Sequence, residues 1–291
     1  MKYALIVMVS MAMSLIAQES PQAPLYQEWN AYKFHKHTKK TLILAKLILD
    51  RYSLHNCRSA LDVGCGPGAL TAVIAKNAPQ ANVVGIDPSD SMIRFARVRY
   101  GKQKNLHFMQ EDMCNTSLTG PLDFTFSCNA FQYLSKEEQI KALKAMARLS
   151  NGTLLMIMAA KSDKPGDLEK AYAATIAMPQ WKKLQTINLG DYYQPHNSST
   201  FAQLIKDTGF LLRGTQTVDD HLVFKNVNKL RKFIKSWITG FGFVAALSKD
   251  EQKLLLRDLI QNYVKEVPPM LDGSIEWTSP RLVVYAEKAK T

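Results

Sequence analysis

Short apolar runs alternate with amphipathic stretches through the first half of the chain. Runs with the length and composition of buried strands lie at 59–63, 82–86, 105–110, 121–128 and 153–158. Stretches with apolar residues at helical spacing lie at 69–78, 89–100 and 136–149, and Ser89 is a suitable N-cap for the second of them. This alternation predicts a doubly wound α/β fold, whose mostly parallel sheet binds ligands at the carboxyl ends of its strands.

The flanking segments are less regular. Apolar positions between Leu25 and Tyr52 predict one helix before the first strand. After residue 160, helical patterns at 166–179, 200–208, 228–238 and 249–266 are interleaved with expected strands at 210–224 and 281–287. We therefore predict a seven-stranded sheet whose last two strands bracket a helical cap. The expected domain has a core at 25–160 and cap helices with the final two strands at 161–291, preceded by an apolar segment at 1–17.

Composition narrows the class of protein further. The 291 residues are 46% hydrophobic and 21% charged, which is ordinary for a globular chain and excludes collagen, coiled coil and disorder. Cys57, Cys65, Cys114 and Cys128 form no CxxC pair and have no histidine at metal-ligand spacing. We expect buried free thiols, with no metal site and no disulfide framework.

The charge and the N-terminus leave several possibilities open. A net charge of +12 favours acidic partners, but we interpret its densest cluster, KFHKHTKK at 33–40, as a solvated helix face rather than a nucleic-acid patch. The opening MKYALIVMVSMAMSLIA is similar to a secretion signal, although Leu15 suits the cleavage rule poorly and the run is shorter than the roughly 20 residues of a membrane span. A cleaved signal, an uncleaved membrane-associated segment and an N-terminal extension all remain possible.

The sequence LDVGCGPGAL (61–70) places three alternating glycines directly after the first expected strand. Such a loop lets the backbone turn tightly and approach a ligand, which predicts a nucleotide-like cofactor rather than a plain strand-to-helix turn. Gly64, Gly66 and Ala69 also satisfy a dinucleotide fingerprint, with Asp87 about 20 residues later, so an NAD enzyme must be considered. However, Pro67 deletes a backbone donor that a pyrophosphate would use, and the carboxylate of Asp62 would repel phosphate and attract an ammonium. A cofactor with an amino group, a ribose and an adenine but no phosphate fits better than NAD.

LDVGCGPG resembles the first motif of the class I S-adenosylmethionine-dependent methyltransferases, and the similarity continues in order through GIDPSDSMIRFAR, MQEDM and FTFSCNAFQYL. The matching region covers about residues 25–160 and implies a Rossmann-like methyltransferase fold with S-adenosylmethionine as cofactor. The resemblance assigns to the cofactor a set of residues near the ends of the first four strands: Asp62, Gly64, Cys65, Gly66, Asp87, Pro88, Met92, Asp112, Met113, Cys128 and Asn129.

The same resemblance implies how these residues divide the cofactor between them. Asp62 and the glycines would line the methionine end, and the two carboxylate oxygens of Asp87 would accept both ribose hydroxyls. An alternative role for Asp87 is N-cap of the following helix. Asp112 would accept the adenine amine while Met113 packs on the ring, and the end of the fourth strand would present backbone to the amino acid part.

The methyl acceptor is predicted from an absent motif and from the tail. SCNA (127–130) replaces the [D/N/S]PP[Y/F/W] segment typical of amino methyltransferases, which weighs against DNA and amide nitrogen. DGSIEWTSPRLVVYAEK (272–288) and FSCNAFQYL resemble segments of the trans-aconitate methyltransferase group, which esterifies small carboxylic acids. That group usually has His-Trp where this chain has Gln132-Tyr133, so the resemblance leaves the identity of the methyl acceptor open. The acceptor-site candidates are Gln132, Tyr133, Trp181, Tyr192, Tyr193 and Arg281.

We therefore expect methyl ester formation on a small carboxylic acid. A carboxylate is already nucleophilic, so no catalytic base is obligatory, and His196 and His221 are isolated. The alternatives are methylation of a phenol, amine or lipid-like acceptor, or a non-catalytic S-adenosylmethionine-binding protein. We expect a monomer that binds no nucleic acid and contacts membranes only through an uncleaved N-terminus. A cytoplasmic site is favoured over a secreted or membrane-associated one, because the cofactor is made and used inside cells.

Overall fold

One seven-stranded sheet organises the chain. The computed structural model describes residues 29–187 and 192–290, so the apolar segment at 1–17 lies outside the described residues. The strand order is β3-β2-β1-β4-β5-β7-β6, and β7 is antiparallel to both of its neighbours while the first five strands pair in parallel. The strands are β1 (Ser59–Val63), β2 (Asn82–Asp87), β3 (Leu106–Gln110), β4 (Leu122–Cys128), β5 (Ser150–Ala159), β6 (Phe210–Phe224) and β7 (Ile275–Lys288). The doubly wound, mostly parallel seven-stranded sheet predicted from the sequence is confirmed.

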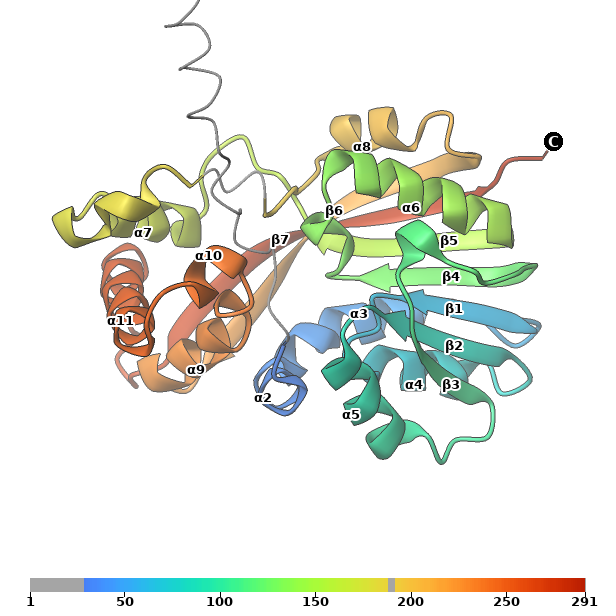
Figure 1. The fold of residues 1–291 in the computed structure, drawn as a ribbon, viewed down its shortest axis with the longest axis horizontal. Helices are drawn as coiled ribbons and strands as arrows, with labels where there is room; N and C mark the ends of the chain where they lie inside the picture. Colours follow the sequence, from blue (N-terminus) through green and yellow to red (C-terminus); the bar gives the residue numbers. More distant parts are fainter. Residues whose placement is uncertain (1–28, 188–191, 291) are drawn as a thin grey trace, which may run out of the picture.

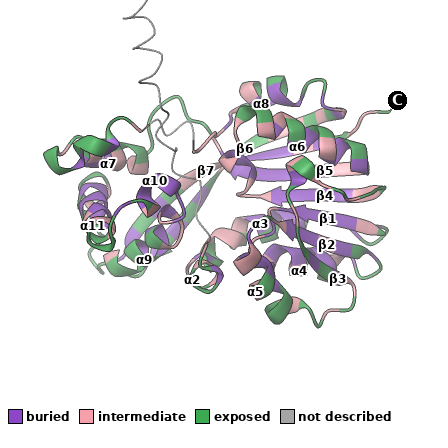
Figure 2. Ribbon diagram, viewed as in Figure 1, coloured by how far each residue is buried: buried purple, intermediate pink, exposed green. Residues whose placement is uncertain are grey.

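Helices cover both faces of this sheet (Figure 1). On one face, α3 (Leu42–Leu49), α4 (Ala69–Asn77) and α5 (Asp90–Tyr100) pack in a core that includes Phe124 and Phe126 of β4. On the other, α6 (Lys136–Leu149) and α8 (Ser198–Ile205) pack on a second core. Successive β5 residues alternate between the two cores, because strand side chains point to opposite faces; the central strands β1, β4 and β5 are accordingly largely buried on both sides (Figure 2).

The cap is built on an extension of the last two strands. Pairing between β5 and β7 ends at Ala159 and Arg281, whereas β6 and β7 stay paired as far as Phe224 and Ile275. Packed on this two-stranded extension are α7 (Asp167–Ile176), the 3-10 helix η4 (Pro179–Leu184), α9 (Val227–Ile238), α10 (Gly242–Ala245) and α11 (Lys249–Glu266). They enclose a third core beside one end of the sheet (Figure 1), as the expected helical cap requires.

Several boundaries differ from the sequence-based expectation. The single helix expected between residues 25 and 52 is, in its described part, two helices, α2 (Ala31–His37) and α3, joined by the 3-10 turn η1 (Lys39–Thr41). The Thr38 hydroxyl donates to the Phe34 carbonyl at this break. The last strand begins at Ile275 rather than near 281, because its first residues alternate polar and apolar and pair with β6 alone.

The cysteines and helices bear on two further expectations. All four cysteines are free, with Cys57 and Cys65 buried, but Cys114 and Cys128 are half-buried rather than fully buried as expected. Within 29–187 and 192–290, each helix is too short or too polar to cross a bilayer.

Candidate cofactor and acceptor site

A cavity of about 400 Å³ opens where β1, β2 and β4 end. This is the edge of the sheet at which a doubly wound fold binds its ligand. The cavity wall includes all eleven residues expected to contact the cofactor: Asp62, Gly64, Cys65, Gly66, Asp87, Pro88, Met92, Asp112, Met113, Cys128 and Asn129. Four acidic residues line it, and no Lys or Arg does so within the described chain.

The three glycines of the loop after β1 serve different purposes. All three have φ in the left-handed region, between +53° and +82°. A Cβ on Gly64 would lie 2.2 Å from the Ala130 Cβ, and one on Gly68 would lie 2.6 Å from the Phe108 ring. Gly66 alone of the three has no atom within 4 Å of that position. Two glycines therefore permit close packing, and Gly66 leaves its side-chain space to the cavity.

Asp87 joins the glycine loop to the start of α5. Its Oδ2 accepts from the Gly66 backbone N–H at 2.9 Å, and its Oδ1 accepts from the Ser89 N–H at 3.0 Å. The side chain of Ser89, not that of Asp87, caps α5 by accepting from the Met92 N–H. The expected Ser89 cap is thus confirmed, and the alternative N-cap role for Asp87 is wrong. Asp87 lines the cavity, and a carboxylate can accept hydrogen bonds from hydroxyl donors.

Asp62 is a buried carboxyl group at the floor of the cavity. Burial, with a smaller effect from the negative charge of Asp87, raises its pKa to about 7, although the hydrogen bond from Thr71 Oγ1 at 2.7 Å acts to lower it. A buried carboxyl group beside a second carboxylate makes a site that a cation would stabilise. An ammonium group on the ligand would restore the Asp62 carboxylate.

We expect ligand binding to depend on pH through Asp62. A group with a pKa near 7 is protonated below that pH, and an ammonium binds the carboxylate form, so affinity for S-adenosylmethionine should fall about tenfold per pH unit below 7 and level off above it. Calorimetry between pH 5.5 and 8 measures this slope. Asp62→Asn should bind more weakly at pH 8 and show no slope. A wild-type affinity that is flat across this range would contradict the assignment.

The far end of the cavity is shaped by Asp112 and two methionines. Asp112 accepts from the Cys114 N–H at 2.9 Å and from the Asn115 side-chain amide at 3.0 Å, which fixes its carboxylate. Met92 and Met113 are both buried and line the cavity. This combination of a fixed carboxylate and flat apolar contacts suits an aromatic ring that carries an amine.

Sequence reasoning missed the wall that the N-terminal helix supplies. The cavity is also lined from this side by Trp29, Phe34, His35, Thr38, Thr41 and Leu42. Ser91 donates to the Trp29 carbonyl, and the Trp29 ring lies 6.2 Å from that of Tyr133. No motif marks these residues. The signal that could have found them is the pair of aromatic residues Trp29 and Phe34, just before and within the helix that precedes the cofactor-binding segment.

Some acceptor candidates gather beside the cavity near the end of β4. Tyr133 lines it, and the Tyr193 ring lies 5.9 Å from the Tyr133 ring. Arg281 of β7 donates through Nη1 to Asn129 Oδ1 at 3.1 Å, and its Nε lies 3.7 Å from Asp220 Oδ2 without a hydrogen-bond partner of its own. Asn129 has φ of 56°, an uncommon conformation for a residue other than glycine. Cofactor and acceptor candidates therefore meet at Asn129.

A small number of charged groups act on the acceptor candidates near the end of β4. Burial raises the pKa of Tyr133 and of Tyr193, so both phenols are neutral donors at physiological pH. Burial also raises the pKa of Asp220, against the opposing effect of Arg281. The positive charge acting on both tyrosines is that of Arg281, and Glu169 adds a negative charge near Tyr193.

Two further candidates occupy different positions. The Gln132 side chain is buried, with an Oε1 that has no hydrogen-bond partner, directly before Tyr133. Tyr192 packs against Phe241 and Phe243 at the edge of the cap, with ring centroids 6.5 and 5.1 Å away. Neither lines the cavity wall.

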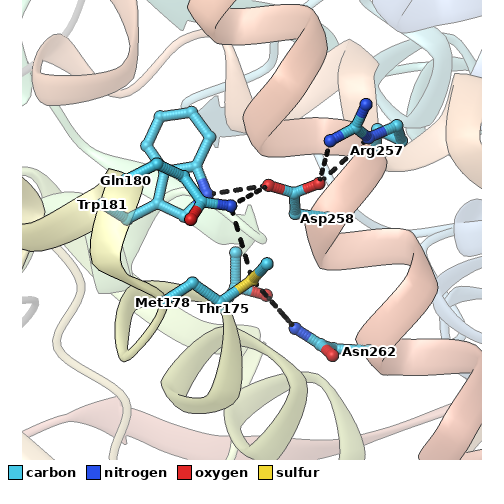
Figure 3. A network of polar contacts seen from close by, with 7 residues as sticks. All are labelled: Thr175, Met178, Gln180, Trp181, Arg257, Asp258 and Asn262. Carbon is cyan, nitrogen blue, oxygen red and sulfur yellow. Dashed lines mark hydrogen bonds and ion pairs between the residues drawn. The ribbon is translucent and has the colours of Figure 1, made fainter.

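Trp181 is not brought to this site. It is 1% exposed in the cap core, and its indole Nε1 donates to Asp258 Oδ2 at 3.0 Å, beside a second bond from Gln180 (Figure 3). Arg257 donates to the other oxygen of the same carboxylate. A network of this kind ties η4 to α11, so the structure places Trp181 in cap packing.

Trp181→Phe is therefore expected to lower stability and leave the acceptor kinetics unchanged. Losing one donor to a buried carboxylate costs about 1–3 kcal/mol, which lowers Tm by about 2–6 °C in a chain of this size. Calorimetric melting and the acceptor KM measure the two effects. A raised KM with an unaltered Tm would return Trp181 to the acceptor site.

His196 has a structural position rather than a catalytic one. Its Nε2 lies 2.9 Å from Gln139 Oε1, its Nδ1 lies 3.3 Å from Thr200 Oγ1, and burial lowers its pKa to about 4. His221 contacts Thr278 on the outer strand pair. In the part of the chain that the structure describes, His, Cys, Asp and Glu side chains form no group that could hold a metal.

Comparisons with known proteins agree with this geometry. Residues 60–151 match the family model of a methyltransferase domain. Trans-aconitate 2-methyltransferases of Rhodopseudomonas palustris and Rhizobium etli are 24% and 26% identical over 272 and 266 residues, covering 90% and 89% of this chain and 99% of each relative.

Solved structures show the same fold. An N-methyltransferase of Haemonchus contortus with bound S-adenosylhomocysteine has a TM-score of 0.55 and 16% identity, covering 89% of this chain and 57% of that one. An O-methyltransferase of Brevibacillus brevis, also with S-adenosylhomocysteine, has a TM-score of 0.52 and 13% identity, covering 84% and 71%.

Proposed function

We propose that this chain, a class I S-adenosylmethionine-dependent methyltransferase similar to the trans-aconitate methyltransferases, converts the carboxylate of a small acid into a methyl ester. The observation that carries this proposal is the position of Arg281, whose side chain is 12% exposed and is held at Asn129, where the cavity meets the acceptor candidates. A guanidinium binds a carboxylate through two parallel hydrogen bonds.

The cavity residues fit the cofactor. The cofactor carries an ammonium and a sulfonium, and the wall provides four acidic side chains, of which Asp62 is buried, and no Lys or Arg among its described residues. Gly66 leaves open space, Asp87 offers acceptors for ribose hydroxyls, and Asp112 with Met113 suits adenine. We propose that the eleven cofactor residues act in these roles.

Methyl transfer to a carboxylate requires the protein mainly to position the two reactants. When bound, S-adenosylmethionine supplies an activated methyl group, which a carboxylate oxygen accepts while the electrons of the broken carbon–sulfur bond stay on sulfur. No proton moves, so a general base is not needed. Arg281 would orient the carboxylate, and Tyr133, Tyr193 and Trp29 would exclude water from the reacting atoms.

The charge balance also favours an acid with a single carboxylate. Arg281 pairs with Asp220, and Glu169 places a negative charge near Tyr193, so further carboxylates on the acceptor would meet negative charge rather than positive. The aromatic rings of Trp29, Tyr133 and Tyr193 would contact the rest of the molecule. We propose an acceptor with one carboxylate and an apolar body.

Product analysis tests this function. The protein is incubated with S-adenosylmethionine and either octanoate, trans-aconitate, catechol or a primary amine, and methylated products are identified by mass spectrometry. We expect methyl octanoate, with a kcat/KM about tenfold or more above that for trans-aconitate. Preferred transfer to the phenol or amine would overturn the ester proposal, and preferred transfer to trans-aconitate would overturn the single-carboxylate proposal.

Cellular location and assembly follow as proposals. Because the cofactor is made inside cells, we infer an active site that faces the cytoplasm. A monomer remains our prediction.

A further inference from the structure

Two basic segments that are distant in sequence lie side by side on the surface. Helix α2 packs against α9, close to the N-terminal wall of the cavity (Figure 1). Burial lowers the pKa of His37 in α2, and Lys36, Lys232, Lys229 and Lys33 lower it further by their charge, which places these four lysines around one imidazole. We call them, with Lys40, the basic surface.

This surface is not neutralised by acidic neighbours. Residues 29–49 and 225–240 contain five Lys or Arg residues each and no Asp or Glu. All ten side chains are exposed, and none takes part in an ion pair with another described residue. Elsewhere the protein does pair its surface lysines, as Lys183 pairs with Glu251 and Lys253 with Asp250. These two segments therefore carry most of the net charge of +12.

Apolar groups lie within the same surface. Tyr32 of α2 is 62% exposed with Lys36 over its ring, and Val223 is 45% exposed where Lys40 donates to its carbonyl. Amphipathic aromatic rings among lysines suit the interface of a bilayer, where ring and ammonium meet headgroups together.

The apolar sequence at 1–17, which lies outside the described residues, indicates what the basic surface binds. The apolar sequence at 1–17 has Lys2 as its one charged residue and ends twelve residues before Trp29. At about 3.3–3.6 Å per residue, that connection reaches at most about 43 Å, so both features can contact one membrane. A weak apolar anchor combined with a polybasic patch gives stable attachment where either feature alone does not.

We propose that the basic surface docks on an anionic lipid bilayer. The electrostatic attraction adds to whatever membrane affinity residues 1–17 provide, and it depends on anionic lipid and on ionic strength. The proposal is independent of which acceptor is methylated. It assigns a role to the positive charge that the methyl-transfer site does not use.

Vesicle flotation with the full chain tests the proposal. Binding is compared between phosphatidylcholine vesicles and vesicles with 30 mol% phosphatidylglycerol, at about 0.1 and 0.5 M NaCl. We expect a partition coefficient at least about tenfold higher on anionic vesicles at low salt, with most of the difference lost at high salt. A variant with Lys33, Lys36, Lys229 and Lys232→Glu should lose this preference.

A matched variant controls for net charge. Substituting Glu for Lys102, Lys104, Lys144 and Lys206, four exposed lysines outside the basic surface, should retain most of the preference for anionic vesicles. Melting by circular dichroism checks that both variants fold. Binding that ignores lipid charge, an equal loss in both variants, or displacement from anionic vesicles by a 20-nucleotide RNA at equal charge concentration would overturn the proposal.

Discussion

Replacing Asp87 with alanine is expected to weaken S-adenosylmethionine binding by about a hundredfold or more. In the proposed complex its carboxylate accepts both ribose hydroxyls, and hydrogen bonds to a charged group contribute about 1.5–3 kcal/mol each. The substitution also removes the acceptor of the Gly66 N–H, while Gly64 and Cys65 still donate to the Ile86 carbonyl of β2. Isothermal calorimetry measures the change directly.

Two controls separate binding from folding. Asp87→Asn keeps one oxygen acceptor and is expected to show a smaller loss. Asp112→Asn alters the adenine end and should weaken binding while leaving the Gly66 contact intact. An Asp87→Ala protein that melts like wild type and binds S-adenosylmethionine with wild-type affinity would show that the ribose lies elsewhere.

Replacing Arg281 with methionine should reduce kcat/KM for the carboxylic acid by about 30-fold to 4,000-fold. The guanidinium is the positive group beside Tyr133 and Tyr193, and truncating one partner of a buried, hydrogen-bonded charge pair costs about 2–5 kcal/mol. Steady-state kinetics at saturating S-adenosylmethionine measures the loss. Arg281→Lys keeps the positive charge but loses the two parallel N–H donors of the guanidinium, and we expect an intermediate kcat/KM.

The partner of Arg281 needs its own control, because Arg281→Met leaves the buried Asp220 without a counter-charge. The double variant Arg281→Met with Asp220→Asn removes both charges and should regain stability without regaining activity. Asp220→Asn alone removes a competing carboxylate and should preserve or raise kcat/KM. Full activity of a folded Arg281→Met protein would exclude Arg281 from acceptor binding.

The core of the fold was predictable because its signals are local. Buried strands and amphipathic helices are periodic within a few residues, so the first five strands and the helices between them could be located from the sequence. The cofactor cavity was predictable for a related reason: parallel strands end at the same edge, and motifs that follow them must converge there. Gly66 and Asp87, 21 residues apart, are bonded as a result.

Only the tertiary structure brings the acceptor-site candidates together and joins the two helices of the basic surface. Tyr133, Tyr193 and Arg281 come from three separate elements, and they meet because β7 is antiparallel beside β5 and brings Arg281 opposite Ala159. Trp181 is aromatic like Tyr133, yet the hydrogen bond that its indole donates to Asp258 holds it in the cap. Burial favours an aromatic ring equally in a core and at a ligand site, so residue type cannot separate the two. Likewise, the sequence predicts a solvated basic face at 33–40 and a separate helix at 228–238, and only the packing of α2 against α9 makes one surface of both. Sequence determines what is local and periodic, whereas contacts between distant segments depend on the free energy of packing the whole chain.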